Sequence, residues 1–136
     1  MLAVAGCQPA PAAVLSVTAN GTAGMNPGPD GTDRPLTLTI IQMGGTGGFD
    51  GADFFALQDP QTALGGDFLG AQQLTLGAGS SAATQVSIQP TAIAVGFVAG
   101  FRDPGGKVFR RRLPAPSGPA SAVVTVTSSG LTVQSA

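Results

Sequence analysis

Alternation of apolar and polar side chains is the strongest pattern in the chain. Residues 14–18 and 36–43 alternate in this way, with Leu36, Leu38 and Ile40 on one face of the second segment. Successive side chains of a strand point to opposite faces, so such segments can bury one side. The same pattern recurs in six later segments: 72–77, 84–89, 92–102, 107–113, 121–127 and 131–135. About eight short strands predict an all-β chain folded as a two-sheet β-sandwich.

The segment 92–102 differs from the others because both of its faces are apolar. One face carries the larger side chains and the other the smaller ones: Ile93, Val95, Phe97, Ala99 and Phe101 against Ala94, Gly96, Val98 and Gly100. This pattern is typical of a central strand covered on both sides. Asp103-Pro104-Gly105-Gly106 has Pro and Gly where a type II turn needs them. It predicts a hairpin between 92–102 and 107–113.

Helix signals are confined to a short insertion around residues 50–69. Asp50 is a candidate N-cap for the sequence GADFFALQ, in which Phe54 and Leu57 are three residues apart. Asp59-Pro60 reads as an N-cap followed by Pro in the first turn, and Gly65-Gly66 ends the second piece. Both pieces are about two turns at most, so they depend on tertiary packing.

The longest irregular stretch is Ala19–Pro35, which is rich in Gly, Pro and Asn. These residues favour turns, so no regular element is expected there. Loops of this length inside a compact domain are usually either functional or disordered. We expect Met25 to be exposed at the loop, as an adaptable apolar group suited to an interface.

Composition argues against an enzyme and against a nucleic-acid partner. The 136 residues carry 10% charged side chains and a net charge of −1, which gives no long-range attraction to nucleic acid. The seven acidic residues are all Asp, and the chain has no His. General acid–base catalysis usually recruits His or Glu. A metal site of His and Cys cannot be built from one Cys. We therefore predict no catalytic residue, metal or cofactor.

Three local motifs have plainer interpretations than the chemistry they suggest. Residues 77–82 fit the pattern G-x-G-x-x-A, but a β-branched segment follows instead of a helix, so a turn is predicted. The pairs Asp30/Asp33 and Asp50/Asp53 lack the spacing of a calcium loop, and turns or caps account for them. The basic run 110–112 alternates along a strand, which favours an edge strand protected by charge. A second interpretation, in which a buried Arg112 forms an ion pair with an Asp, is also left open by the sequence.

The single cysteine, Cys7, follows Val4-Ala5-Gly6, which resembles a bacterial lipobox. This predicts a lipidated cysteine, and Gln8 after it favours the outer membrane. Only six residues precede Cys7 and none is basic, so we expect a signal peptide that begins further upstream. The expected organisation is a signal-peptide remnant at 1–6, a lipidated tether at 7–12 and a β-sandwich domain at 13–136.

Several stretches together resemble the outer-membrane lipoprotein family of the type VI secretion system, the TssJ family. They follow in the family's order and cover nearly the whole chain: MNPGPDGTDRPLTLTIIQM, FDGADFFAL, LGGDFL, LTLGAGSSAATQVSI and VGFVAGFRDPGGKVFRRRL. The resemblance implies a transthyretin-like sandwich, tethered to the inner leaflet of the outer membrane and facing the periplasm. It implies a non-enzymatic role in the secretion system's membrane complex, without a small-molecule substrate.

The resemblance also implies a partner and a binding loop. Family members bind the periplasmic C-terminal domain of the inner-membrane protein TssM through the loop between the first two strands. This loop maps onto Asn20–Arg34, and its candidate contact residues are Asn20, Met25, Asn26, Pro27, Asp30, Asp33 and Arg34. A ligand- or carbohydrate-binding periplasmic or surface module is the alternative. Such modules usually present Trp or Tyr platforms, and this chain has neither. A transthyretin-like hydrolase is disfavoured by the missing His.

Overall fold

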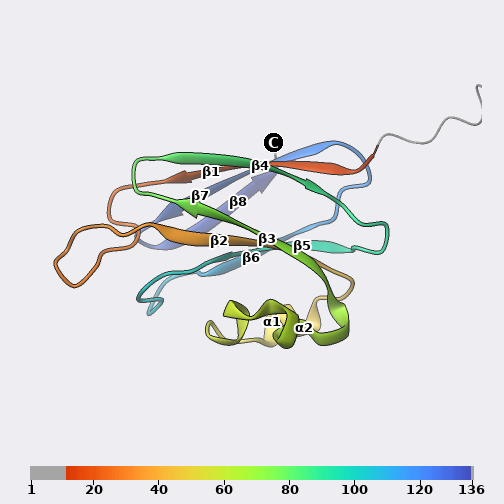
Figure 1. The fold of residues 1–136 in the computed structure, drawn as a ribbon, viewed down its shortest axis with the longest axis horizontal. Coiled ribbons are helices and arrows are strands. Elements are labelled where there is room, and N and C mark those ends of the chain that lie inside the picture. Colours follow the sequence, from red (N-terminus) through yellow and green to blue (C-terminus); the bar gives the residue numbers. More distant parts are fainter. Residues whose placement is uncertain (1–11, 136) are drawn as a thin grey trace, which may run out of the picture.

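Eight strands form two four-stranded sheets that pack face to face (Figure 1). The computed structural model describes residues 12–135. The first sheet has the order β4-β1-β7-β8, and its strands are β4 (Ser81–Ser87), β1 (Val14–Gly21), β7 (Ala120–Thr127) and β8 (Gly130–Ser135). The second has the order β3-β2-β5-β6, and its strands are β3 (Phe68–Leu76), β2 (Leu36–Met43), β5 (Ala94–Ala99) and β6 (Arg110–Pro114). The predicted two-sheet sandwich is confirmed.

All strand pairs are antiparallel except one. β1 pairs with β7 in parallel, from Leu15 opposite Ala120 to Gly21 opposite Val126. On its other side β1 pairs antiparallel with β4. β1 is therefore an interior strand of its sheet, and it runs from one end of the sandwich to the other (Figure 1).

The main core lies between the two sheets. Leu15, Val17 and Ala19 of β1 face inward, as the alternation predicted. From the second sheet, Leu36, Leu38 and Ile40 of β2 join the same cluster, together with Val95, Phe97 and Ala99 of β5. Phe97 is fully buried. Burial of such a large side chain favours folding by roughly 1.5–3 kcal/mol.

A second, smaller core lies on the outer face of the second sheet, beneath a layer of short helices (Figure 1). Its elements are α1 (Gly47–Gly51), η2 (Ala56–Gln58), α2 (Pro60–Leu64) and η3 (Gly65–Asp67). From this layer Phe49, Leu57 and Leu64 pack against Ala94 and Val98 of β5. All six residues of β5 are buried, which confirms the predicted central strand covered on both sides.

Of the two helix N-caps predicted in the insertion, one is confirmed and the other is wrong. Asp59 is the N-cap of α2, Pro60 begins the helix, and Gly65 ends it with a φ of +57°. Asp50 does not cap a helix: it lies within α1, whose N-cap residue is Thr46. Asp53 accepts the local bond instead: the backbone N–H of Ala56 donates to its Oδ1 at 2.8 Å.

The predicted hairpin between β5 and β6 is confirmed, but its turn is displaced by one residue. The N–H of Lys107 donates to the carbonyl of Pro104 at 3.0 Å, and Gly106 has the positive φ of +74°. A type II turn at 103–106 would need that conformation at Gly105. The turn predicted at 77–82 is present, with Ser80 N–H donating to Gly77 O at 3.2 Å and Gly79 at φ +73°.

None of the helices within residues 12–135 has the length and apolar character needed to cross a membrane.

We expect Gly96→Ala to destabilise the fold, because β5 packs against the helical layer through this glycine. A Cβ at Gly96 would lie 2.6 Å from Phe49 Cε1 and 2.7 Å from Met43 Cε. Overpacking of this kind typically costs about 1–3 kcal/mol. Urea denaturation measures the loss. Gly66→Ala is the matched control, since nothing lies within 4 Å of its Cβ position. Equal stability of the two variants would contradict this account of the packing.

Candidate functional site

The connection between β1 and β2 projects from one end of the sandwich (Figure 1). We call residues 22–35 the β1–β2 loop. It is shorter than predicted, because residues 19–21 belong to β1. Asn20 is therefore a strand residue, and its Oδ1 accepts a hydrogen bond from Ser81 Oγ of the neighbouring β4 at 2.6 Å.

The tip of the loop is a small hairpin of its own. Pro27 and Asp33 form an isolated antiparallel bridge, and Gly28 N–H donates to Thr32 O at 2.8 Å. Gly31 N–H donates to Gly28 O at 2.9 Å, and Gly31 has a φ of +81°. This is a tight turn followed by a glycine in the left-handed region, which Pro-Asp-Gly favours. The tip thus has a defined shape despite its lack of a regular strand.

Both loop carboxylates stabilise the loop's own backbone, as the turn interpretation predicted. Asp33 accepts bonds from Gly24 N–H at 2.8 Å and from Asn26 N–H at 3.1 Å. Asp30 accepts from Thr32 N–H at 3.0 Å and pairs with Arg34 Nη2 at 3.2 Å. Within residues 12–135, no three His, Cys, Asp or Glu side chains are grouped as a metal site would require.

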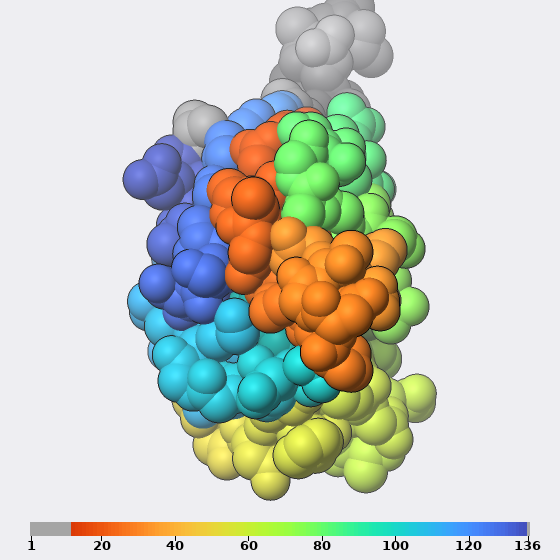
Figure 2. Space-filling view, turned by 90° about the vertical axis from the view of Figure 1, so that its left-hand side faces the viewer, coloured from red at the N-terminus to blue at the C-terminus, as the bar shows by residue number. Residues whose placement is uncertain are grey.

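Asn26 joins the loop to a second segment of the chain. Its amide donates to the carbonyls of Arg34 and Pro35 at 3.2 and 3.4 Å. Its Oδ1 accepts from the N–H of Arg102 at 2.8 Å, and Arg102 Nε donates to Pro27 O at 2.9 Å. Asn26 is buried, so its own three bonds are partly shielded from water, whereas the bond from Arg102 to Pro27 lies at the surface. The β1–β2 loop and the start of the β5–β6 connection therefore form one continuous surface (Figure 2).

Arg102 is a site residue that sequence reasoning missed. It lies 76 positions from Asn26, and no local pattern links the two residues. The one available signal was the Asn-Pro pair inside a loop predicted to be exposed, because an Asn that packs under a turn needs several partners. That signal does not indicate where the partners lie.

The expectation that Met25 is exposed was wrong. Its side chain is fully buried and belongs to the core between the sheets. A flexible, apolar side chain can fill an irregular gap, here at the end of the sandwich under the loop. Among the other predicted contact residues Asn26 is buried and Asp33 half-buried, whereas Pro27, Asp30 and Arg34 are exposed.

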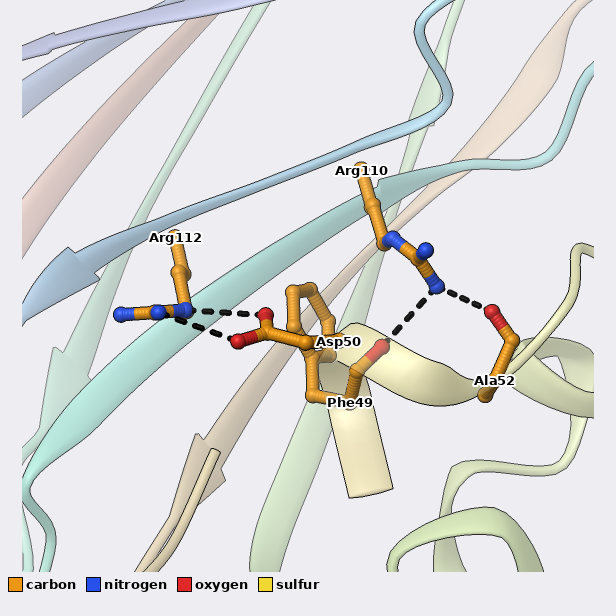
Figure 3. Close-up of polar contacts among 5 residues, drawn as sticks. All are labelled: Phe49, Asp50, Ala52, Arg110 and Arg112. Carbon is orange, nitrogen blue, oxygen red and sulfur yellow. Dashed lines mark hydrogen bonds and ion pairs between the residues drawn. The ribbon is translucent and has the colours of Figure 1, made fainter. Parts of the chain in front are cut away.

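The basic run lies on β6, an edge strand of the second sheet, as predicted. Arg112 forms a two-point contact with Asp50, with Nε–Oδ1 and Nη2–Oδ2 distances of 3.0 Å (Figure 3). The pair is half-exposed, not buried. Hydrogen bonding from Arg112 holds the pKa of the Asp50 carboxyl below its ordinary value, although slight desolvation acts in the opposite direction. The same bond raises the pKa of Arg112.

Arg110 also contacts the helical layer. Its Nη1 donates to the carbonyl of Phe49 at 2.9 Å and to that of Ala52 (Figure 3). A hollow of about 320 Å³ lies among these residues. Because Arg110 and Arg112 are both engaged by α1 and its end, the cluster fastens the helices to the edge strand.

The lipobox residues Val4, Ala5 and Gly6 and the candidate lipidation site Cys7 lie outside the described residues.

Comparison with solved structures finds close likenesses in fold. The T6SS lipoprotein TssJ1 from Pseudomonas aeruginosa has a TM-score of 0.84 at 24% identity, covering 93% of this chain and 98% of that chain. Serratia marcescens Lip, described as a membrane-bound component of the type VI secretion system, has a TM-score of 0.78 at 22% identity, with 89% and 96% covered. A chain of the structure described as "T6SS protein TssM C-terminal domain (869-1107) from EAEC" has a TM-score of 0.74 at 24% identity, with 89% and 97% covered. No curated protein matches the sequence.

A family model gives the assignment that fold alone does not. The model is T6SS-SciN, described as "Type VI secretion lipoprotein, VasD, EvfM, TssJ, VC_A0113", and it matches residues 13–134. The match covers both sheets, the helical layer and the β1–β2 loop. The chain therefore belongs to the type VI secretion lipoprotein family that includes TssJ and VasD.

Proposed function

We propose that this protein is anchored in the outer membrane by lipid on Cys7 and faces the periplasm. There it binds the periplasmic C-terminal domain of TssM with the β1–β2 loop, as a non-enzymatic part of the secretion system's membrane complex. Family membership supports the general role. The observation that carries the binding site is an ordered, protruding loop at the end of the sandwich opposite the chain's entry (Figure 1).

The arrangement of the two ends supports a role as a connector. The described chain begins at Ala12, beside the start of β1, and the loop follows the last residue of β1. Eight strand residues span about 26 Å at 3.3 Å per residue. An anchor attached before Ala12 and a partner bound at the loop therefore occupy separate surfaces.

The loop presents charges on a frame that is already ordered. Asp30 and Arg34 form an exposed ion pair that contributes little to stability, so both remain available to a partner. Arg102, also exposed, lies against the same loop. The backbone beneath them is held by Asp33 and Asn26. A preformed loop loses less conformational entropy when it binds, which favours affinity.

The structural likenesses supply further support for the partner. The residue range 869–1107 of the described TssM domain is longer than this whole chain, yet 97% of the matched chain is covered. The matched chain is therefore shorter than that domain, which indicates a smaller companion protein in that structure. The carbohydrate-binding alternative finds no support in the family assignment.

We expect Cys7→Ser, expressed from the complete gene, to release the protein from the membrane. Each buried methylene contributes about 0.8 kcal/mol to anchoring, so loss of the acyl chains removes the dominant membrane interaction. The measurement is fractionation of cells into periplasmic and outer-membrane material, with Ser16→Ala as a control. A Cys7→Ser protein that still sediments with the outer membrane would refute the anchor.

We expect the tip of the loop to determine affinity for the TssM domain. Replacement of residues 28–32 by Asn-Gly shortens the tip while it retains the buried Met25 and Asn26. Calorimetry should show at least about tenfold weaker binding, equivalent to about 1.4 kcal/mol, with an unchanged melting temperature. The double variant Ser117→Ala/Gly118→Ala, at the other end, is the control. Undiminished affinity of the shortened loop would contradict the proposal.

We expect Asn26→Leu to loosen the loop. The change leaves the N–H of Arg102 and the carbonyls of Arg34 and Pro35 without their partner. An unsatisfied buried polar group costs about 1–3 kcal/mol, so hydrogen exchange at Arg102 and Gly24 should accelerate by tenfold or more. Asn20→Leu is the matched control, because Asn20 has one side-chain bond near solvent. Equal exchange in both variants would show that Asn26 does not hold the loop.

A further inference from the structure

One end of the sandwich is free of charged side chains. The acidic and basic residues are confined to 30–34, 50–67 and 102–112. The end at which β1 begins is formed by residues 12–13, 88–93 and 115–119, and none of these is charged. We call these residues the amino-terminal pole. Asp67 lies near it, but beside Gly45 on the helical layer.

The amino-terminal pole is also hollowed and apolar. A hollow of about 620 Å³ lies there, lined mainly by apolar residues such as Ile88, Pro90 and Pro116, with Ser87, Gln89 and Ser117 as its polar members. Ile93 is beside it, and its carbonyl accepts the N–H of Ala115 at 3.0 Å. The side chain of Ile93 is 57% exposed, one of few large apolar side chains in residues 12–135 that face water. A lone exposed apolar side chain is common, but Ile93 adjoins the mainly apolar hollow and extends it into one patch, and such patches mark interaction sites.

The covalent geometry of the chain places lipid near this pole. This step rests on the proposed anchor at Cys7. Cys7 precedes Ala12 by five residues, which span at most about 18 Å when fully extended. The amino-terminal pole is thus tethered within this distance of the bilayer. The β1–β2 loop lies at the opposite end of β1 and is therefore further from the bilayer by about the length of that strand (Figure 1). A short tether raises the effective concentration of lipid at the pole.

We propose that the amino-terminal pole seats on the lipid surface, with Ile93 in the boundary between headgroups and acyl chains. The contact is apolar and makes no ion pair with lipid. Dehydration of a charged side chain would oppose the contact, but the pole has no charged side chain. The β4-β1-β7-β8 sheet is also uncharged, but its exposed face carries polar side chains such as Thr18 and Gln85. The pole also has exposed polar residues, Gln89, Thr91 and Ser117, but only the pole adds an exposed large apolar side chain, Ile93, and three prolines. The pole therefore fits lipid better than the sheet face does.

The absence of Trp and the single Cys allow a direct test in the whole chain. Cys7 is coupled to a maleimide-headgroup lipid in vesicles of phosphatidylethanolamine and phosphatidylglycerol. Single tryptophans are introduced by Ile93→Trp and Ser117→Trp at the pole. The matched controls are Phe55→Trp, at a side chain 77% exposed on the helical layer, and Thr18→Trp on the sheet face. All four positions are exposed, so the variants should fold, and circular dichroism checks this.

The expected result is specific to the pole. On coupling, acrylamide quenching of both pole tryptophans should fall about twofold or more, and brominated lipid should quench them, because tryptophan favours the membrane interface. The two control tryptophans should not change. Neither salt nor the phosphatidylglycerol fraction should matter, because the pole is uncharged.

Three results would overturn the proposal. Unchanged exposure at position 93 or 117 would mean that the pole stays in water, and protection at position 18 would mean that the sandwich lies on its sheet. Protection that requires a high protein-to-lipid ratio would identify a second copy of the chain as the occupant. Chemical coupling supplies the anchor in every case, so these results are independent of whether the cell acylates Cys7. Failure of the Cys7→Ser prediction would leave them unaffected.

Discussion

Burial of β5 on both faces is the constraint on which the other features depend. Phe97 faces the opposite sheet, whereas Ala94 and Val98 face the helical layer. Gly96 leaves the space that the ring of Phe49 occupies. Beyond the strand, Gly100 N–H donates to Thr37 O at 2.8 Å, which directs the chain towards Arg102 and its bond to Asn26. Packing at the centre of the sheet therefore determines where the β1–β2 loop is held.

The features that sequence reasoning predicted are those set by neighbours in the chain. Alternation in 36–43 identified the inward face of β2, and Asp59-Pro60 identified the start of α2. The failures involve distant partners. Asp is a common N-cap residue, but Asp50 pairs with Arg112, which is 62 positions away. Met25 lies in a polar loop yet fills the core. Neither contact produces a periodic pattern in the sequence, because each contact depends on which distant segments the fold brings together.

The distribution of charge matches the two contacts that we propose. Charged residues lie in the β1–β2 loop, in the helical layer and around the β5–β6 hairpin. Several Arg side chains there donate to backbone carbonyls, several Asp side chains accept from backbone N–H groups, and two pairs bind each other. The sheet β4-β1-β7-β8 carries none. Recognition of a protein partner benefits from charges that select a complementary surface. A surface that rests near lipid benefits from their absence, so one small domain can present both.

The central position of β1 has a mechanical consequence. β1 pairs with β4 over residues 14–20 and with β7 over residues 15–21. With the proposed anchor before Ala12 and the proposed partner at the β1–β2 loop, tension between them would act along the axis of this strand. The hydrogen bonds to both neighbours lie across that axis, so they are loaded together in shear instead of being unzipped one after another. In the proposed arrangement, the strand that connects the two ends is thus oriented to bear a pulling force between anchor and partner.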